Sequence, residues 1–431
     1  MPKATPLSIL PLSSIIRSLT ITSISSSTLL LPPSLYIMAR LAHTNSPILS
    51  PDTNPILRSF LKRTFYKQFC AGENATEVHS TANSLRSLGF SGVILAYAKE
   101  VVLSDSQHAA LSSCGDDSTA EQCIKEEIIP WANGTMETVK MTRPGDFVAL
   151  KFTGAGSQAL FDLSQETGPS KALREAIDSI CDLAEQRDVK LLFDAEQAAI
   201  QKGIDRWTLQ YMERYNAKTP GRATVYGTYQ AYLKATPSVL ARHLKAAREG
   251  GFTLGVKLVR GAYLGSDPRH LIHDSKADTD RHYDGIAESL CRRSYGPVLQ
   301  AAEGETQFPE VNVVLAGHNI NSVRKAKALR QAQKERSEKQ TELVYAQLQG
   351  MADEVSCELV QAGIAEKSKK VDVDVPKVYK YLVWGTTGEC MKYLLRRAQE
   401  NKDAVQRTRD GRDAMAGELW RRMRRIVGLG A

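Results

Sequence analysis

Four polar residues share one face of a short segment near the C-terminus, KYLLRRAQEN at 392–401. At 100° of rotation per helical residue, Tyr393, Arg396, Arg397 and Glu400 fall within an arc of about 100°. Two guanidinium groups on one face suit a carboxylate or a phosphate, because a planar guanidinium matches either group with paired hydrogen bonds. An ordinary solvated helix face would give the same pattern. The segment is therefore either a ligand clamp or a solvated helix face, and features elsewhere in the chain distinguish the two.

Elements that could position such a clamp recur along the chain. Eight runs read as β-strands: GVILAY (92–97), DFVALKFTG (146–154), VKLLFDAE (189–196), ATVYGTYQ (223–230), TLGVKLVRGAY (253–263), VNVVLAGHN (311–319), LVYAQLQG (343–350) and KVYKYLVWG (377–385). Most of the intervening segments have helical periodicity, which is typical of parallel βα units. Eight such units predict an α/β fold, a (β/α)8 barrel with insertions, rather than a two-domain open sheet.

Polar residues gather where these predicted strands end. In a parallel barrel the active site lies at the carboxyl ends of the strands, and scattered placement would be expected if these residues had no common role. The strand-end residues are Lys151, Asp194, Glu196, Gln230, Arg260, Tyr263, His318, Asn319, Gln347, Leu348 and Tyr381.

Composition excludes several classes of function. The chain has 431 residues and a net charge of +8. Hydrophobic residues make up 42% of it, which is enough for a large core. We find no zinc-finger spacing, RNA-binding signature or long basic run, so we expect no nucleic-acid partner. The seven cysteines are scattered without a CxxC pair, and His270 with His273 lacks further ligands, so we expect no metal site.

The two ends of the chain differ from the middle. Residues 1–50 are Ser- and Leu-rich and contain no acid, which resembles a mitochondrial targeting sequence; a helix pair of the mature protein is the alternative. Residues 51–90 have helical periodicity. Residues 403–431 predict a basic helix with Leu419, Trp420, Met423 and Val427 on one face. That helix could contact a membrane surface or simply pack as a terminal helix.

Several motifs in order give the chain a family resemblance. They are FDAEQ (193–197), TYQAYLK (228–234), KLVRGAY (257–263), GHN (317–319) and YLVWGTTGECMKYLLRRAQEN (381–401), within a region of about 54–416. With them the chain resembles the proline dehydrogenase family, fungal mitochondrial type. The resemblance implies a distorted barrel over 91–402 with a C-terminal helix over its mouth. It also implies FAD-dependent oxidation of L-proline to 1-pyrroline-5-carboxylate, by hydride transfer to flavin N5. Electrons would pass to quinone, with possible peripheral contact with the inner mitochondrial membrane.

The resemblance also implies roles for particular residues. Arg396 and Arg397 would bind the proline carboxylate, with Glu400 helping to orient them. The remaining substrate-site residues would be Tyr381 and Tyr393 around the ring, Leu348 as an apolar wall, and Lys151, Asp194 and Tyr263. The FAD-binding residues would be Gln230, Lys257, Gly261, Ala262, Lys276 and His318.

Three alternatives remain beside this interpretation. Val383 stands where many relatives have proline, and Lys257 where bacterial relatives have arginine. The first alternative is that the substrate is hydroxyproline or another cyclic amino acid. GAGSQA at 154–159 resembles a dinucleotide-binding turn and would suggest an NAD-dependent oxidoreductase. However, Asp194 lies 35 residues beyond Ala159, where about 20 are expected. A catalytically silent barrel that serves as an interaction protein is the third alternative, and the intact arginine pair argues against it.

Overall fold

The computed structural model describes residues 5–44, 46–99, 113, 117–368, 374–403 and 405–426. It separates into two compact units. The first comprises Met1–Val93, Gln347–Lys369 and Val378–Ala431, and the second comprises Ile94–Ala346 and Lys370–Lys377. The predicted division into segments 1–50, 51–90, 91–402 and 403–431 follows sequence features instead and stays a prediction.

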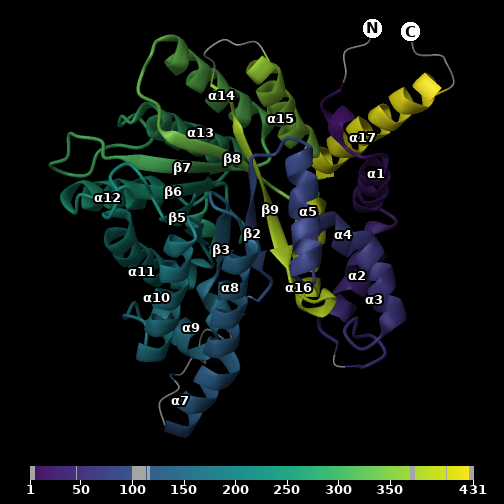
Figure 1. Ribbon diagram of the computed structural model, residues 1–431, viewed down its shortest axis with the longest axis horizontal. Coiled ribbons are helices and arrows are strands. Elements are labelled where there is room, and N and C mark those ends of the chain that lie inside the picture. Colours follow the sequence, from purple (N-terminus) through teal and green to yellow (C-terminus); the bar gives the residue numbers. More distant parts are fainter. Residues whose placement is uncertain are drawn as a thin grey trace. The chain divides into compact units, whose positions relative to one another are not determined.

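The second unit is built on consecutive parallel strands (Figure 1). Each strand pairs with the next one in the chain; for example, Leu150 lies opposite Phe193, and Gln230 opposite Val259. The strands are β2 (Gly92–Tyr97), β3 (Phe147–Leu150), β4 (Lys190–Phe193), β5 (Val225–Gln230), β6 (Leu254–Val259), β7 (Val311–Ala316) and β8 (Glu342–Leu348). Their burial is nearly continuous, as expected for strands covered on both faces.

Helices connect these strands. In α10 the apolar residues Leu173, Ile177, Ile180 and Ala184 recur at helical spacing and are fully buried, which is why this segment packs by one face. The helical segments of this unit are α7 (Asp117–Cys123), η3 (Ile124–Ile128), α8 (Ile129–Met141), η4 (Phe152–Ala155), α9 (Ser157–Ser164), α10 (Lys171–Gln186), α11 (Ala198–Asn216), α12 (Thr236–Glu249), η5 (Arg269–Leu271), α13 (Lys276–Arg292) and α14 (Ile320–Glu335).

The first unit contains both ends of the chain. Its elements are η1 (Pro6–Ile9), α1 (Leu12–Ser26), α2 (Leu31–Ala42), α3 (Pro55–Leu61), η2 (Lys62–Tyr66), α4 (Lys67–Phe69), β1 (Cys70–Gly72), α5 (Ala75–Ser87), α15 (Asp353–Ser368), β9 (Lys377–Trp384), α16 (Thr387–Asp403) and α17 (Val405–Ile426). The short strand β1, which the sequence patterns did not predict, pairs in parallel with β9, with Cys70 opposite Val383.

Strand β9 completes the sheet. The Ser91 N–H, just before β2, donates to the Val378 carbonyl at 2.8 Å, and the Gln349 N–H, just after β8, donates to the Tyr381 carbonyl at 2.9 Å. All eight predicted strands are present, and the eight-stranded parallel barrel predicted from them is confirmed.

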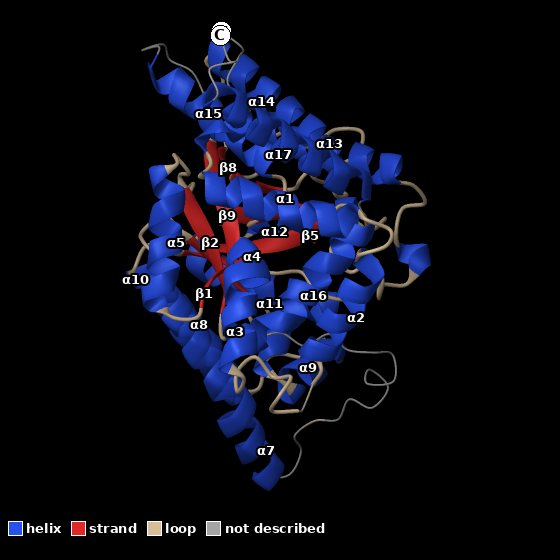
Figure 2. Ribbon diagram, turned by 90° about the vertical axis from the view of Figure 1, so that its right-hand side faces the viewer, coloured by secondary structure: helices blue, strands red, loops and turns tan. Residues whose placement is uncertain are grey.

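Residues near the N-terminus form an apolar cluster with helices from the C-terminal part. Leu7, Ile15, Cys357 and Met415 are buried together, and α1 lies beside α17 (Figure 2). None of the described helices combines the length and the apolar composition of a membrane span. Helices α1 and α2, which meet at a bend of 104°, reach that threshold only as a pair.

Candidate active site

A buried carboxylate between two lysines lies at the carboxyl ends of β3, β4 and β6. Asp194 directly follows β4, and its Oδ2 accepts a hydrogen bond from Lys151 Nζ at 3.3 Å. Its other oxygen accepts from Lys257 Nζ, on β6. Burial lowers the pKa of the Lys257 ammonium, and the adjacent Asp194 carboxylate opposes that shift. Two amino groups thus flank one carboxylate, an arrangement that suits an anionic or electron-rich ligand.

Gln230, the last residue of β5, links two neighbouring loops. Its Nε2 donates to the Glu196 carbonyl at 3.3 Å, and its Oε1 accepts from the Ala262 N–H at 3.2 Å. Glu196 is 2% exposed, and its carboxylate accepts hydrogen bonds from the Thr153 N–H, at 3.2 Å, and the Thr153 hydroxyl. The strand-end residues Gln230 and Glu196 therefore hold the loops after β3, β4 and β6 in a fixed relation.

The loop after β6 requires a glycine at 261. A Cβ added there would lie 2.2 Å from the Tyr232 ring, so only glycine fits. Tyr232 in turn donates to Asp267, whose other oxygen accepts from the Ala198 N–H at 2.8 Å. The loop places Ala262 on the surface, whereas Tyr263 is only 6% exposed.

A second charged cluster lies beside this loop and includes a residue that the predicted FAD site omitted. Arg260 Nε donates to Asp280 at 3.0 Å, and its guanidinium stacks on the Tyr283 ring at 4.2 Å. Asp280 also pairs with Lys276, at 2.5 Å, and accepts a hydrogen bond from Asn319 Nδ2 at 3.3 Å. The strand-end pattern did contain Arg260 and Asn319, so the signal was present in the sequence.

The two predicted FAD residues nearest this cluster differ in exposure. The side chain of Lys276 is 78% exposed, whereas His318, two residues beyond β7, is half-buried. The adjacent Gly317 leaves room for the guanidinium of Arg260, because a Cβ added at Gly317 would lie 3.2 Å from Arg260 Nη1.

The GAGSQA turn does not offer a dinucleotide site. Helix α9 begins at Ser157, and its first N–H donates to Glu127 Oε2 at 2.7 Å. The Ser157 hydroxyl donates to the other oxygen of Glu127 at 3.1 Å. A carboxylate of the chain thus occupies the position where a pyrophosphate would bind a helix N-terminus.

In the first unit, α16 begins with a fully capped N-terminus. Thr386 Oγ accepts from the Glu389 N–H at 3.2 Å, and Glu389 Oε2 accepts from the Thr386 N–H at 2.8 Å, a reciprocal capping box. Asp52 accepts from the Gly388 N–H and Glu73 from the Thr387 N–H, both at 2.9 Å. Three carboxylates therefore complement the positive end of the helix dipole.

The predicted polar face of α16 is largely buried. Arg397 is 4% and Tyr393 5% exposed, and the Arg397 guanidinium lies 4.9 Å from the centre of the Tyr393 ring. Arg396 is half-buried. The opposite face, with Met391, Leu394, Leu395 and Ala398, is buried too. The side chain of Glu400 lies outside the described residues. A solvated outer face is thereby ruled out for Arg397 and Tyr393, while their role as a ligand clamp stays a prediction.

Strands β8 and β9 place the two other predicted residues of this unit near each other. Leu348 ends β8, and the Gln349 N–H that follows it donates to the Tyr381 carbonyl at 2.9 Å. Tyr381 is 8% exposed, and Leu348 is half-buried. The intervening Lys380 is 2% exposed and pairs with Asp353 at 2.7 Å. Lys380 is therefore a structural lysine on the face of β9 opposite Tyr381.

The residues around the loop after β6 suit a phosphate-bearing cofactor. Arg260 Nη1 is buried and has no hydrogen-bond partner, so it is a donor that suits an acidic group such as a flavin-nucleotide phosphate. Lys276 adds an exposed cation, and Gly261 a close backbone turn. These residues fit FAD. Among the described residues, no group of three or more metal-binding side chains occurs.

Comparison with known proteins is consistent with this geometry. The family described as proline dehydrogenase matches residues 78–410. A protein of Schizosaccharomyces pombe named "Probable proline dehydrogenase, mitochondrial" is 29% identical over 406 residues, covering 84% of this chain and 80% of its own. A human protein named "Hydroxyproline dehydrogenase" is 28% identical over 406 residues, covering 85% of this chain and 82% of its own.

Solved structures share the fold. Proline utilization A from Bdellovibrio bacteriovorus, inactivated by N-propargylglycine, superimposes with a TM-score of 0.65 at 18% identity and covers 89% of this chain. The chain spans 38% of that much longer protein. At this identity the likeness shows the barrel fold alone.

Proposed function

The chain belongs to the proline dehydrogenase family, and from this premise we propose that it oxidises L-proline to 1-pyrroline-5-carboxylate with FAD as cofactor. The observation that carries the proposal is the buried arginine and tyrosine on α16. The planar guanidinium of arginine matches the carboxylate of an amino acid with paired hydrogen bonds, and Tyr393 forms an aromatic surface against Arg397.

Each residue of the proposed site has a physical role. Arg396 and Arg397 bind the substrate carboxylate, which fixes the orientation of the ring, and Glu400 orients the arginines. Tyr381, Tyr393 and Leu348 enclose the apolar ring. Tyr263 and the buried group of Lys151 and Asp194 complete the substrate site.

No nucleophile is needed for this chemistry. Loss of a hydride from ring carbon C5 is accompanied by C=N formation from the nitrogen lone pair, so the amine must be neutral when it reacts. FAD, when bound, would supply the redox chemistry as the acceptor of this hydride. Gln230, Lys257, Gly261, Ala262, Lys276 and His318 hold the cofactor in this proposal, and we add Arg260 for its unpartnered Nη1. The Lys257 charge favours the reduced, more anionic flavin.

Substrate selectivity is the finer part of the proposal. We favour proline because the first relative above is named a proline dehydrogenase. Hydroxyproline is the second candidate, favoured by the human relative, since one ring hydroxyl is a small difference for an apolar pocket to reject.

The cellular setting rests on the relatives and on the termini. We propose a mitochondrial enzyme of fungal type that passes electrons to quinone, because relatives of 29–33% identity are named mitochondrial. Peripheral contact with the inner membrane is supported by Trp420 and Met423, which are exposed on α17 among arginines. Leu419, predicted on the same face, instead packs toward the cluster of Leu7 and Ile15, and Val427 lies outside the described residues.

The visible spectrum of the purified protein tests the proposal. With oxygen excluded, L-proline should bleach the flavin band, and trans-4-hydroxy-L-proline should do so more slowly. Faster bleaching by hydroxyproline would reverse the substrate assignment. A flavin band that neither compound changes would refute both substrates, and a protein that cannot bind FAD would refute the enzyme.

A further inference from the structure

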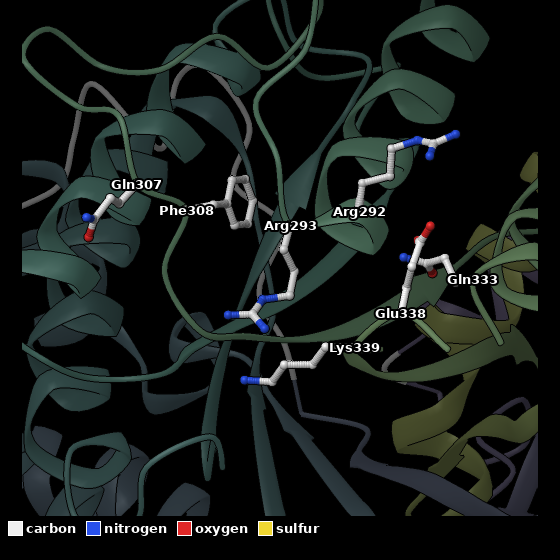
Figure 3. A pocket seen from close by; sticks show the side chains of 7 residues that line it. All are labelled: Arg292, Arg293, Gln307, Phe308, Gln333, Glu338 and Lys339. Atoms are coloured by element: carbon white, nitrogen blue, oxygen red, sulfur yellow. The ribbon is translucent and has the colours of Figure 1, made fainter. Parts of the chain in front are cut away.

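A pocket of about 620 Å³ lies in the second unit (Figure 3). It lies beside the first residues of β7 and β8 and the last turns of α13 and α14. Lys151 and Asp194 directly follow β3 and β4, so they lie at the opposite ends of the strands. Its lining residues are Arg292, Arg293, Gln307, Phe308, Gln333, Glu338 and Lys339. None of them has a role in the proposed oxidation.

Polar atoms without partners gather at this pocket. In the part of the chain that the structure describes, Arg293 Nε and Gln333 Oε1 are buried and have no hydrogen-bond partner, and neither has the hydroxyl of Tyr295, which contacts Phe308. Gln333 is 2% exposed, and its Nε2 donates to the Cys291 carbonyl at 2.9 Å, which fixes the amide orientation. Buried polar groups are normally satisfied. Among the lining residues, one donor, Arg293 Nε, and one acceptor, Gln333 Oε1, therefore have no partner.

Arg293 also has an unusual backbone. It caps the end of α13 with φ +53°, a left-handed conformation that glycine or asparagine usually adopts. Its side chain pairs with Glu310 at 2.6 Å, and Lys339 binds the same carboxylate oxygen at 2.7 Å. Backbone strain of this kind recurs at ligand sites.

The charges favour an anion. Around the pocket, Arg292 pairs with Glu288 at 2.8 Å and Arg336 with Glu338 at 2.5 Å, whereas Arg293 and Lys339 share the single carboxylate of Glu310. The pair on Glu310 therefore leaves one positive charge in excess. Figure 3 shows the charged ends of Arg293 and Lys339 on one side of the pocket and Gln333 with Glu338 on the other. The hollow opens to solvent, and its volume is far larger than an inorganic ion needs.

We propose that this pocket binds a small organic anion. The phosphate or carboxylate of the ligand accepts hydrogen bonds from Arg293 Nε and Lys339. A hydrogen-bond donor of the ligand binds Gln333 Oε1, and the apolar part of the ligand lies on Phe308. Charge-assisted hydrogen bonds to guanidinium supply most of the affinity.

Calorimetric titration of the FAD-loaded protein tests this site with ADP, citrate and inorganic phosphate as probes. We expect ADP or citrate to bind without changing the flavin spectrum. Arg293→Gly, which suits the left-handed backbone, and Gln333→Met should each weaken binding about tenfold or more. Arg214→Ala, which removes a half-exposed arginine on α11, is the charge-matched control and should bind as the unaltered protein does.

The outcomes separate cleanly. ADP binding without citrate binding would assign a phosphate ligand, and the reverse would assign a carboxylate; both support the site. Inorganic phosphate binding as tightly as either organic probe would overturn the proposal. So would the absence of binding by all three probes, or unchanged affinity in Arg293→Gly.

Discussion

Arg397 is buried and lies against the Tyr393 ring. It is on the face of α16 that would contact the substrate carboxylate in the proposed function. Its substitution by methionine keeps most of the side-chain volume and removes the charge. We expect kcat/KM for L-proline to fall on the order of 100-fold, because truncating one partner of a buried charge pair costs several kcal/mol. Steady-state kinetics measures the loss, and the flavin content should stay unchanged.

Two further variants sharpen this prediction. Arg397→Lys keeps the charge but loses the paired hydrogen bonds, so its kcat/KM should lie between those of the unaltered protein and Arg397→Met. Arg63→Met removes an exposed arginine of η2 in the same unit and should leave kcat/KM unaltered. Equal kcat/KM in the unaltered protein and Arg397→Met would refute the clamp.

Single residues also mark what sequence patterns can and cannot predict. Lys151, Asp194 and Gln230 were recognisable because a polar residue that ends an apolar strand stands out. That Asp194 binds both Lys151 and Lys257 was not recognisable, because it depends on the side-chain directions of three strands. Gly261 was predicted to bind the cofactor, which stays a prediction; its close approach to the Tyr232 ring was not recognisable from the sequence.

At the level of elements, the N-terminus of α16 links the clamp helix to the segment before the barrel. Burial by itself raises the pKa of the Glu73 carboxyl, but hydrogen bonds from Arg58, Lys62 and Thr387 outweigh it and lower that pKa to about 2. In the unfolded chain the carboxyl titrates near 4.5. Its stabilising effect is therefore complete above about pH 4.5 and is lost as the pH falls toward 2.

We expect Glu73→Gln to lower the free energy of unfolding by about 1–3 kcal/mol at neutral pH, the cost of weakening hydrogen bonds to a charged group. The difference from the unaltered protein should shrink as the pH falls from 4.5 toward 2. Urea unfolding across this pH range measures it. Glu213→Gln, at an exposed position of α11, is the control. A difference that persists unchanged at low pH would contradict the role of the Glu73 charge.

The eight strands were predictable because continuous apolar runs end in polar residues, a signal local to each run. Strand β1 was not, since three residues carry no periodicity. The period of α16 was also readable, but the burial of Tyr393 and Arg397 was not. Helices α2 and α1, which come from a distant part of the sequence, pack against α16, as does the adjoining α17. The sequence pattern of α16 alone carries no sign of these neighbours.

At the scale of the whole molecule, the first 50 residues admit two interpretations. Their composition predicts a targeting sequence, yet the described part of this segment is integrated into the fold. Glu418, on α17, has a fully buried carboxylate that pairs with Arg421 and Arg422 and accepts a hydrogen bond from Thr5. Arg422 also donates to the Leu10 carbonyl at 2.9 Å. Removing this segment would expose that carboxylate and the apolar residue Met415.

The neighbouring residues Ile15 and Ile16 provide a matched test. Ile15 is 0% exposed, within the cluster of Leu7, Cys357 and Met415, whereas Ile16 is 48% exposed. If α1 belongs to the mature protein, Ile15→Ala should lower the free energy of unfolding by about 2–5 kcal/mol, and Ile16→Ala should change it little. Urea unfolding of protein purified from mitochondria, with its N-terminus sequenced, measures both. Equal stability of the two variants, with a sequenced N-terminus beyond residue 50, would assign the segment to targeting alone. α17 would then need another partner for its buried face.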